Sequence, residues 1–172
     1  MRFAVLGSGS QGNGTLIVSA DTCVLVDCGF SLRETERRLL RLGVDPAQLS
    51  AILVTHEHAD HVHGVGLLSR RYNLPVYLSQ GTLRGMRKPV EVAGFVRGGE
   101  SLQIGALRID VIAVAHDAQE PTQFVFSDGQ RRFGLLTDLG SYCAGVLDGY
   151  RGLDALMIEA NHCRDRLARG YY

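Results

Sequence analysis

Four residues that can bind metal fall within one six-residue stretch of this chain, directly after an apolar run. The stretch is His-Glu-His-Ala-Asp-His at residues 56–61, and the run is Ala-Ile-Leu-Val at residues 51–54. A short apolar run of this kind is typical of a buried strand. Imidazoles and a carboxylate delivered to one point suit zinc and neighbouring first-row metals. The sequence therefore predicts a metal centre at the end of a buried strand, with a polar loop of incidental histidines as the alternative.

The composition indicates one domain with a sizeable core. The chain has 172 residues, of which 45% are hydrophobic and 21% charged, and its formal net charge is zero. We expect residues 1–172 to form a single domain. There is no apolar run long enough for a membrane span and no apolar secretory leader, so we expect a cytoplasmic protein without membrane contact. Zero net charge argues against nucleic-acid binding by bulk charge but permits a local basic patch.

Hydrophobic patterns predict alternating strands and helices. Strands are expected over residues 3–6, 15–19, 23–27, 51–54, 75–78, 101–104, 107–115 and 155–158, the last one buried. Apolar runs around Asp128-Gly129 indicate a hairpin. One helix should begin after Ser31, which forms a capping-box pattern with Glu34, and stop at Gly43. Others are expected over residues 61–71, 81–88 (helix or turn) and 141–147.

Two of these helices have candidate apolar faces. The first would bury Leu32, Leu39, Leu40 and Leu42, and the helix over residues 61–71 would bury Val62, Val65, Leu67 and Leu68. The mixed order of elements predicts layered α/β packing. By itself it does not separate a four-layer sandwich from other mixed folds.

Further motifs follow in an order known from one protein family. They are Ser-Gly-Ser-Gln-Gly-Asn at 8–13, Asp-Cys-Gly-Phe-Ser at 27–31, a lone His116, Thr-Asp-Leu-Gly at 137–140 and Glu-Ala-Asn-His at 159–162. Together with the hexapeptide they resemble the metallo-β-lactamase-fold hydrolases, and in particular the YycJ/WalJ branch of exonuclease-like phosphodiesterases. The resemblance implies an αββα sandwich with its ligands on loops at one edge. It also implies a further histidine loop, strand and helix, so we expect the domain to be truncated at its C-terminus.

The resemblance also implies a ligand set for two divalent metal ions, zinc first and manganese as the alternative. The assignments are His56, His58 and His116 to one metal, Asp60 and His61 to the other, and Asp138 as a bridge. Asp60 would in addition orient or deprotonate the attacking water. From the residues alone, His116 has a capped strand end as its alternative, and Asp138 a helix N-cap.

Five other residues are candidates for supporting roles. Asp27 resembles the carboxylate that orients a ligand in the family, with a turn-forming aspartate as the alternative. Glu159 is a candidate hydrogen-bond partner of a ligand histidine, or a solvated strand end, and His162 follows it in the same motif. The loop over residues 7–14 offers backbone N–H groups, Ser10 and Asn13 to a phosphate, or forms only a tight turn.

Three functions remain open at this stage. The first is a dinuclear phosphodiesterase or exonuclease that attacks DNA or RNA through a metal-bridging hydroxide, because paired metals activate water and neutralise charge on phosphorus. The second is hydrolysis of a small ester, thioester or lactone on the same fold. The third is a metal-binding module without catalytic activity.

Overall fold

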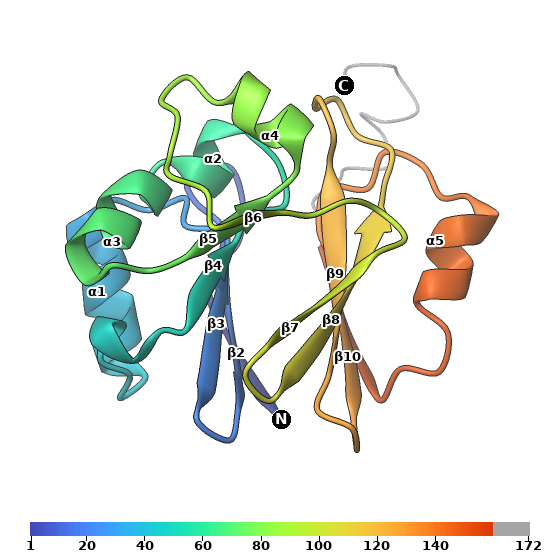
Figure 1. Ribbon diagram of the computed structural model, residues 1–172, viewed down its shortest axis with the longest axis horizontal. Coiled ribbons are helices and arrows are strands. Elements are labelled where there is room, and N and C mark those ends of the chain that lie inside the picture. Colours follow the sequence, from blue (N-terminus) through green and yellow to red (C-terminus); the bar gives the residue numbers. More distant parts are fainter. Residues whose placement is uncertain (160–172) are drawn as a thin grey trace.

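Two β-sheets packed face to face form the centre of the molecule, with helices on both outer faces (Figure 1). The computed structural model describes residues 1–159. The first sheet has the order β1-β2-β3-β4-β5-β6, and the second has the order β11-β10-β9-β8-β7. The αββα sandwich expected from the sequence is confirmed.

The strands of the first sheet are β1 Arg2–Gly7, β2 Gly14–Ser19, β3 Thr22–Val26, β4 Ala51–Leu53, β5 Val76–Leu78 and β6 Gly94–Phe95. Those of the second are β7 Ser101–Ile104, β8 Leu107–Ala113, β9 Thr122–Ser127, β10 Arg132–Leu136 and β11 Ala155–Ile158. The expected hairpin is present, since β9 and β10 pair antiparallel with Ser127 opposite Arg132. The two-residue strand β6 was not expected from the sequence.

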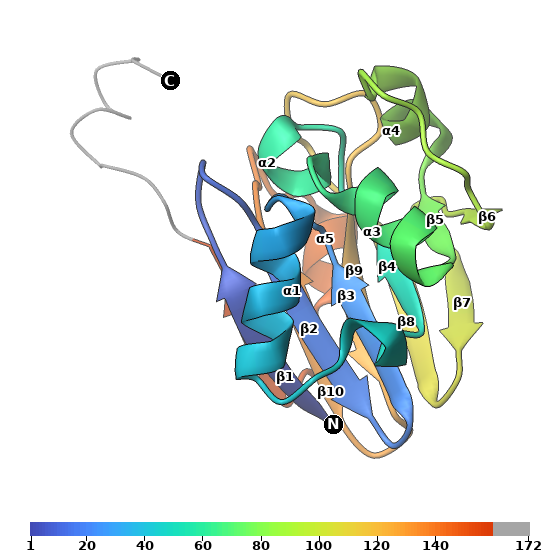
Figure 2. The ribbon, with the colours of Figure 1, turned by 90° about the vertical axis from the view of Figure 1, so that its left-hand side faces the viewer.

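Helices α1 Leu32–Arg41 and α3 Val65–Tyr72 cover the outer face of the first sheet (Figure 2). A 3-10 turn at Pro46–Gln48 follows α1, and α2 Ala59–Val62 and α4 Gln80–Gly85 lie at the upper edge in Figure 1. Helix α5 Ala144–Gly149 packs on β8 of the second sheet. Within residues 1–159, none of these helices has the length and apolar character needed to cross a bilayer.

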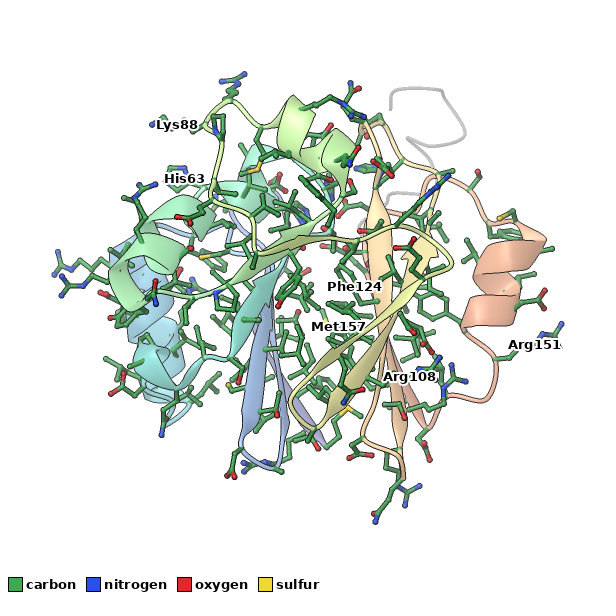
Figure 3. All side chains as sticks on the ribbon, in the orientation of Figure 1. His63, Lys88, Arg108, Phe124, Arg151 and Met157 are labelled. Carbon is green, nitrogen blue, oxygen red and sulfur yellow. The ribbon has the colours of Figure 1, made fainter. Side chains whose placement is uncertain are left out.

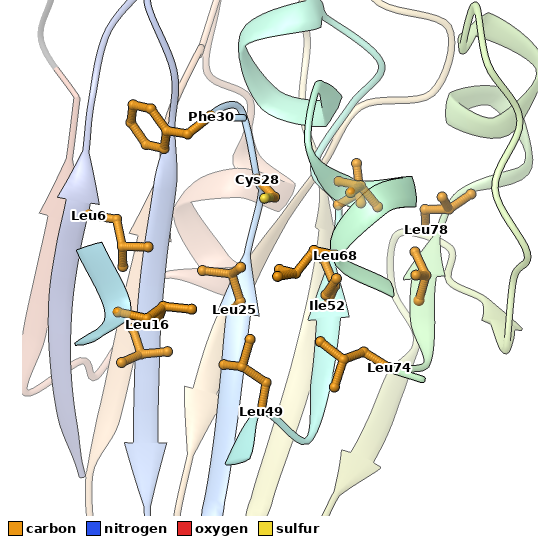
Figure 4. Close-up of a cluster of buried hydrophobic side chains, with 14 of the residues drawn as sticks. Leu6, Leu16, Leu25, Cys28, Phe30, Leu49, Ile52, Leu68, Leu74 and Leu78 are labelled. Carbon is orange, nitrogen blue, oxygen red and sulfur yellow. The ribbon is translucent and has the colours of Figure 1, made fainter. Parts of the chain in front are cut away.

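Side chains of β3 and β4 are buried on both faces, which explains the apolar sequences from Cys23 to Val26 and from Ala51 to Leu53. Leu25 and Ile52 belong to a core beneath the helices (Figure 4). Val24 and Leu53 point the other way, into a core between the sheets that also contains Phe124 (labelled in Figure 3). Burial of each such side chain contributes about 1.5–3 kcal/mol. Strand β4 is thereby fixed on both sides, and the hexapeptide that follows it begins from a rigid point.

The helix expected over residues 61–71 is two helices, α2 and α3, separated at Gly64. The Gly64 N–H donates to the Cys28 carbonyl at 2.7 Å. A Cβ on Gly64 would overlap the Phe30 carbonyl, so this glycine admits the close approach of the loop after β3. The expected inward position of Leu67 is also wrong, because its side chain is 50% exposed.

Three features of α1 and β11 differ from the expectations. Leu40 and Leu42 are exposed, because Leu39 and Thr35 occupy the buried side of α1. Ser31 caps the helix by accepting from the Glu34 N–H, but the Glu34 side chain pairs with Arg37 and Arg38 instead of completing a capping box. Strand β11 is present but largely exposed, since it pairs only with β10 at the sheet edge within the described residues. The expected C-terminal continuation stays a prediction.

Candidate metal centre

The candidate ligands lie at one edge of the sandwich, on loops that leave three strands and, for Asp60 and His61, in the short helix α2. His56 and His58 follow β4, which ends at Leu53. His116 follows β8, and Asp138 follows β10. Because the sequence separates these strands widely, only the packing of the two sheets brings their ends together.

Three imidazole nitrogens form the first ligand group. The Nδ1 atom of His58 lies 3.0 Å from Nε2 of His56 and 3.3 Å from Nε2 of His116. Ligands of a tetrahedral zinc ion with Zn–N bonds of about 2.0 Å are separated by about 3.3 Å. His56 is buried, whereas His58 and His116 are only partly buried. The group therefore has the spacing of a metal-binding trio with one side open.

A second group shares His56 with the first and adds His61 and Asp138. The Oδ2 atom of Asp138 is 3.1 Å from Nε2 of His61, and Asp138 adopts a left-handed conformation with φ of 47°. The Oδ2 atom of Asp60 lies farther from the same nitrogen, at 3.7 Å. The structure thus places Asp60 at the margin of this group, and its role as a ligand stays a prediction.

Asp27 fixes the orientation of His61 from behind. Its Oδ2 atom lies 2.8 Å from Nδ1 of His61 and also accepts from the Thr55 hydroxyl at 2.8 Å. Its Oδ1 atom accepts from the Thr55 backbone N–H at 2.9 Å. All three residues are buried. A carboxylate that accepts from Nδ1–H directs the Nε2 lone pair towards the site, which is the usual arrangement behind a metal-binding histidine.

Charges at the centre shift two histidines in opposite directions. Burial, reinforced by the neighbouring His61 charge, lowers the pKa of His56 to about 3. Burial also opposes a charge on His61, but the Asp27 and Asp138 carboxylates outweigh it and raise the pKa of this ring to about 10. A proton and a metal ion would therefore compete for His61, so metal binding at this ring releases a proton.

Asn13 shows that the second group suits a cation. Its Nδ2 atom lies 2.9 Å from Nε2 of His61 and 3.1 Å from Oδ2 of Asp60, while its Oδ1 atom accepts from the Gly9 N–H. The amide thus requires a lone pair on His61 Nε2, whereas the adjacent Asp138 favours a proton there. Oδ2 of Asp138 is buried and receives no well-directed hydrogen bond from the described residues. A divalent ion would satisfy these acceptors together, which supports divalent metal binding here.

The remaining candidates fall into three positions. Ser10, Asp60 and Glu159 line an open hollow of about 310 Å³, together with Asp138. Glu159 accepts a hydrogen bond from the Ser8 hydroxyl at 2.6 Å. Asn13 is largely buried at the wall of the same hollow, where its amide nitrogen contacts Asp60 and His61, and its role as a donor to a phosphate stays a prediction. His162 lies outside the described residues.

Sequence reasoning missed three residues that support the centre. Thr55, directly before His56, bridges Asp27 and the ligand loop. Glu57 accepts the Gln119 backbone N–H at 2.7 Å and so ties the hexapeptide to the segment after His116. Gly29 lies against the Asp60 backbone. Position next to the ligands was the available clue for Thr55 and Glu57, and the cluster Asp-Cys-Gly was the clue for Gly29.

Gly29→Ala should weaken metal binding without unfolding the domain. A Cβ at this position would overlap the Asp60 carbonyl, a backbone atom that cannot rotate away. The ligand loop would have to move, and a metal site tolerates little displacement of its ligands. We expect metal affinity, measured by calorimetric titration, to fall at least tenfold, on the order of the loss seen when supporting residues are removed.

Gly145→Ala is the matched control for this change. Its added Cβ would meet only Cys143 Sγ, at 3.9 Å, within α5. That variant should bind metal as the unmodified chain does. Equal metal affinity in the Gly29→Ala and Gly145→Ala variants would show that the contact with Asp60 does not position the ligands.

Comparison with known proteins assigns the family. Residues 7–158 match the model of the metallo-beta-lactamase superfamily. The chain is 33% identical to exodeoxyribonuclease YycJ of Bacillus anthracis, over 100% of this chain and 67% of that protein. It is also 33% identical to exodeoxyribonuclease WalJ of Streptococcus pneumoniae strain D39, over 99% of this chain and 66% of that protein.

A solved structure shows the same fold. The metallo-beta-lactamase fold protein YhfI from Bacillus subtilis superposes with a TM-score of 0.76 at 20% identity, covering 95% of this chain and 73% of that one. In the sequence comparisons, this chain spans about two thirds of the length of YycJ and WalJ. The strand-end histidines, the aspartate after β10 and these similarities agree, and the chain belongs to the metallo-β-lactamase superfamily, in its YycJ/WalJ branch.

Proposed function

We propose that this protein is a metal-dependent phosphodiesterase that hydrolyses nucleic acid, with DNA as its first candidate substrate. The observation that supports this most strongly is the pair of ligand groups that share His56 beside an open hollow. The two similar relatives named exodeoxyribonucleases support the substrate class. We propose zinc as the resident ion, with manganese as the alternative, and a cytoplasmic location.

Divalent ions held by these residues would lower the pKa of bound water and neutralise charge on the attacked phosphorus. His56, His58 and His116 would hold one ion, and His61 and Asp138 would contribute to the second. Asp27 keeps Nδ1 of His61 protonated and thereby its Nε2 lone pair available. Asp60, at the wall of the hollow, is the candidate to orient the attacking water or accept its proton, because Asn13 holds one of its oxygens in place.

Metal-loaded protein should hydrolyse a phosphodiester and leave a thioester intact. The measurement compares release of p-nitrophenol from bis(p-nitrophenyl) phosphate with hydrolysis of a thioester, alongside metal content by elemental analysis. Asp60→Asn removes a charge but keeps an acceptor for the Asn13 amide, so this variant should retain part of its metal and lose most of its turnover.

Each competing function predicts a different pattern. Rapid thioester or lactone turnover without phosphodiesterase activity would establish the acyl hydrolase. Full metal occupancy with neither activity would establish the non-catalytic module. The same measurements on a chain extended to the length of the YycJ and WalJ relatives test the predicted C-terminal ligand, which should add a second metal equivalent.

A further inference from the structure

A second hollow, of about 480 Å³, opens between α4, β6 and residues 119–120. Its walls include Gln80 and Arg84 from α4, Phe95 and Arg97 from and just after β6, and Gln119. None of these residues belongs to the candidate metal groups. The hollow is therefore a separate surface feature of the domain.

Contacts with the ligand loop place this hollow beside the metal centre. Gln119, which lines the hollow, donates its backbone N–H to Oε1 of Glu57. Glu57 stands between His56 and His58, and Nε2 of His58 lies 3.2 Å from the Asp117 carbonyl. A Cβ on Gly85, at the end of α4, would come within 2.6 Å of the Glu57 carboxyl carbon. The hollow therefore lies next to the ligand loop, on the side where Glu57 is held.

The side chains in the hollow offer a stacking surface and two positive charges. Phe95 is 52% exposed, although it is a large apolar residue in a strand. Arg84 and Arg97 are exposed, and their guanidinium groups make no hydrogen bond or ion pair with any residue from 1 to 159. Several arginines elsewhere in the described part of the chain are instead held in ion pairs, as Arg37 of α1 is with Glu34. An exposed aromatic ring flanked by free guanidinium groups is the combination that binds single-stranded nucleic acid.

Two carboxylates line the hollow, one held by a hydrogen bond to α4 and one exposed to solvent. The Oε2 atom of Glu120 accepts the Gly81 N–H at 2.7 Å, so that oxygen is directed into α4. Glu100 is exposed and lies three residues beyond Arg97. Glu100 should therefore repel a phosphate. Its removal tests whether the hollow binds an anion.

We propose that this hollow binds the single-stranded part of a nucleic-acid substrate next to the hydrolysed phosphodiester, with a base stacked on Phe95 and phosphates on Arg84 and Arg97. The proposal rests on the proposed function, since it names the strand that the metal centre would cut. It predicts that long substrates gain affinity from the hollow and small phosphodiesters do not.

Fluorescence anisotropy of a labelled single-stranded oligonucleotide, with chelator present so that nothing is cleaved, tests the proposal. Phe95→Ala should weaken binding about five- to hundredfold, the range for loss of one stacked base, while Phe95→Trp should preserve it. Arg84→Gln with Arg97→Gln should weaken binding and reduce the slope of log affinity against log salt by about 1.4. Glu100→Gln should strengthen binding.

The matched control is Arg41→Gln with Arg151→Gln, which removes the same charge at the end of α1 and beyond α5 (Arg151 is labelled in Figure 3). It should leave affinity within about twofold, because neither arginine lines the hollow. All variants should keep the metal content and the bis(p-nitrophenyl) phosphate turnover of the unmodified chain.

Unchanged oligonucleotide affinity in Phe95→Ala and in the Arg84, Arg97 double variant would overturn the proposal. Weaker binding after Glu100→Gln would also overturn it, because removal of a negative charge beside a bound phosphate should remove a repulsion. The proposed function fails on a different result, the absence of metal-dependent hydrolysis of bis(p-nitrophenyl) phosphate. Because binding is measured without metal, the two failures are distinguishable.

Discussion

His58→Ala is expected to lose more than half of the bound metal and all measurable phosphodiester hydrolysis. Nδ1 of His58 lies within 3.3 Å of ring nitrogens from both His56 and His116, so its removal leaves two ligands where three converge. An unfilled position in the first coordination shell weakens binding far more than a surface change does. Elemental analysis gives the metal content, and hydrolysis of bis(p-nitrophenyl) phosphate gives the activity.

His63→Ala is the control for this variant. His58 precedes the short helix α2 and His63 follows it, but His63 is exposed, and Figure 3 shows it away from the sheets. Its loss should change neither metal content nor turnover. Full metal occupancy in the His58→Ala variant would contradict the assignment of the histidine trio.

Asp27→Asn is expected to lower metal affinity about 10- to 100-fold, the range for loss of an orienting carboxylate. Oδ1 of Asp27 accepts a backbone N–H from Thr55, so the amide nitrogen of an asparagine must occupy the Oδ2 position. There it would donate to Nδ1 of His61 and force the ring proton onto Nε2. His61 would then present a proton, and no lone pair, to the metal.

Two further variants separate this tautomer effect from unfolding. Asp27→Ala leaves the buried partners of Asp27 without an acceptor and should lower the free energy of unfolding by about 3–5 kcal/mol, whereas Asp27→Asn should cost much less. Asp21→Asn, at the exposed turn between β2 and β3, should change neither the metal affinity nor the free energy of unfolding. Calorimetric metal titration and thermal unfolding provide both measurements. Unaltered metal affinity in Asp27→Asn would show that Asp27 does not set the His61 tautomer.

Local patterns were sufficient for the strands and for the stretch that holds the histidines. The apolar runs on both sides of the Asp-Gly turn predict β9 and β10, and another apolar run predicts β4, because strand burial follows from the residues themselves. Sequence patterns predicted helix boundaries less well where a segment distant in the sequence packs against the helix. The break at Gly64 exists because the loop after β3 packs against it, and no local feature of residues 61–71 reveals that contact.

The sequence by itself determined the family, the histidine-rich ligand loop and the chemistry it favours, because ligand types and their spacing are local properties. Only the tertiary structure decided which partners those ligands have. Asn13 is bound to Asp60, Asp27 lies behind His61, and Phe95 stands exposed beside Arg84 and Arg97. The first two relations join residues that are 47 and 34 positions apart in the chain. They are fixed by how the two sheets pack and which loops meet at their edge, and a pattern along the sequence does not contain that information.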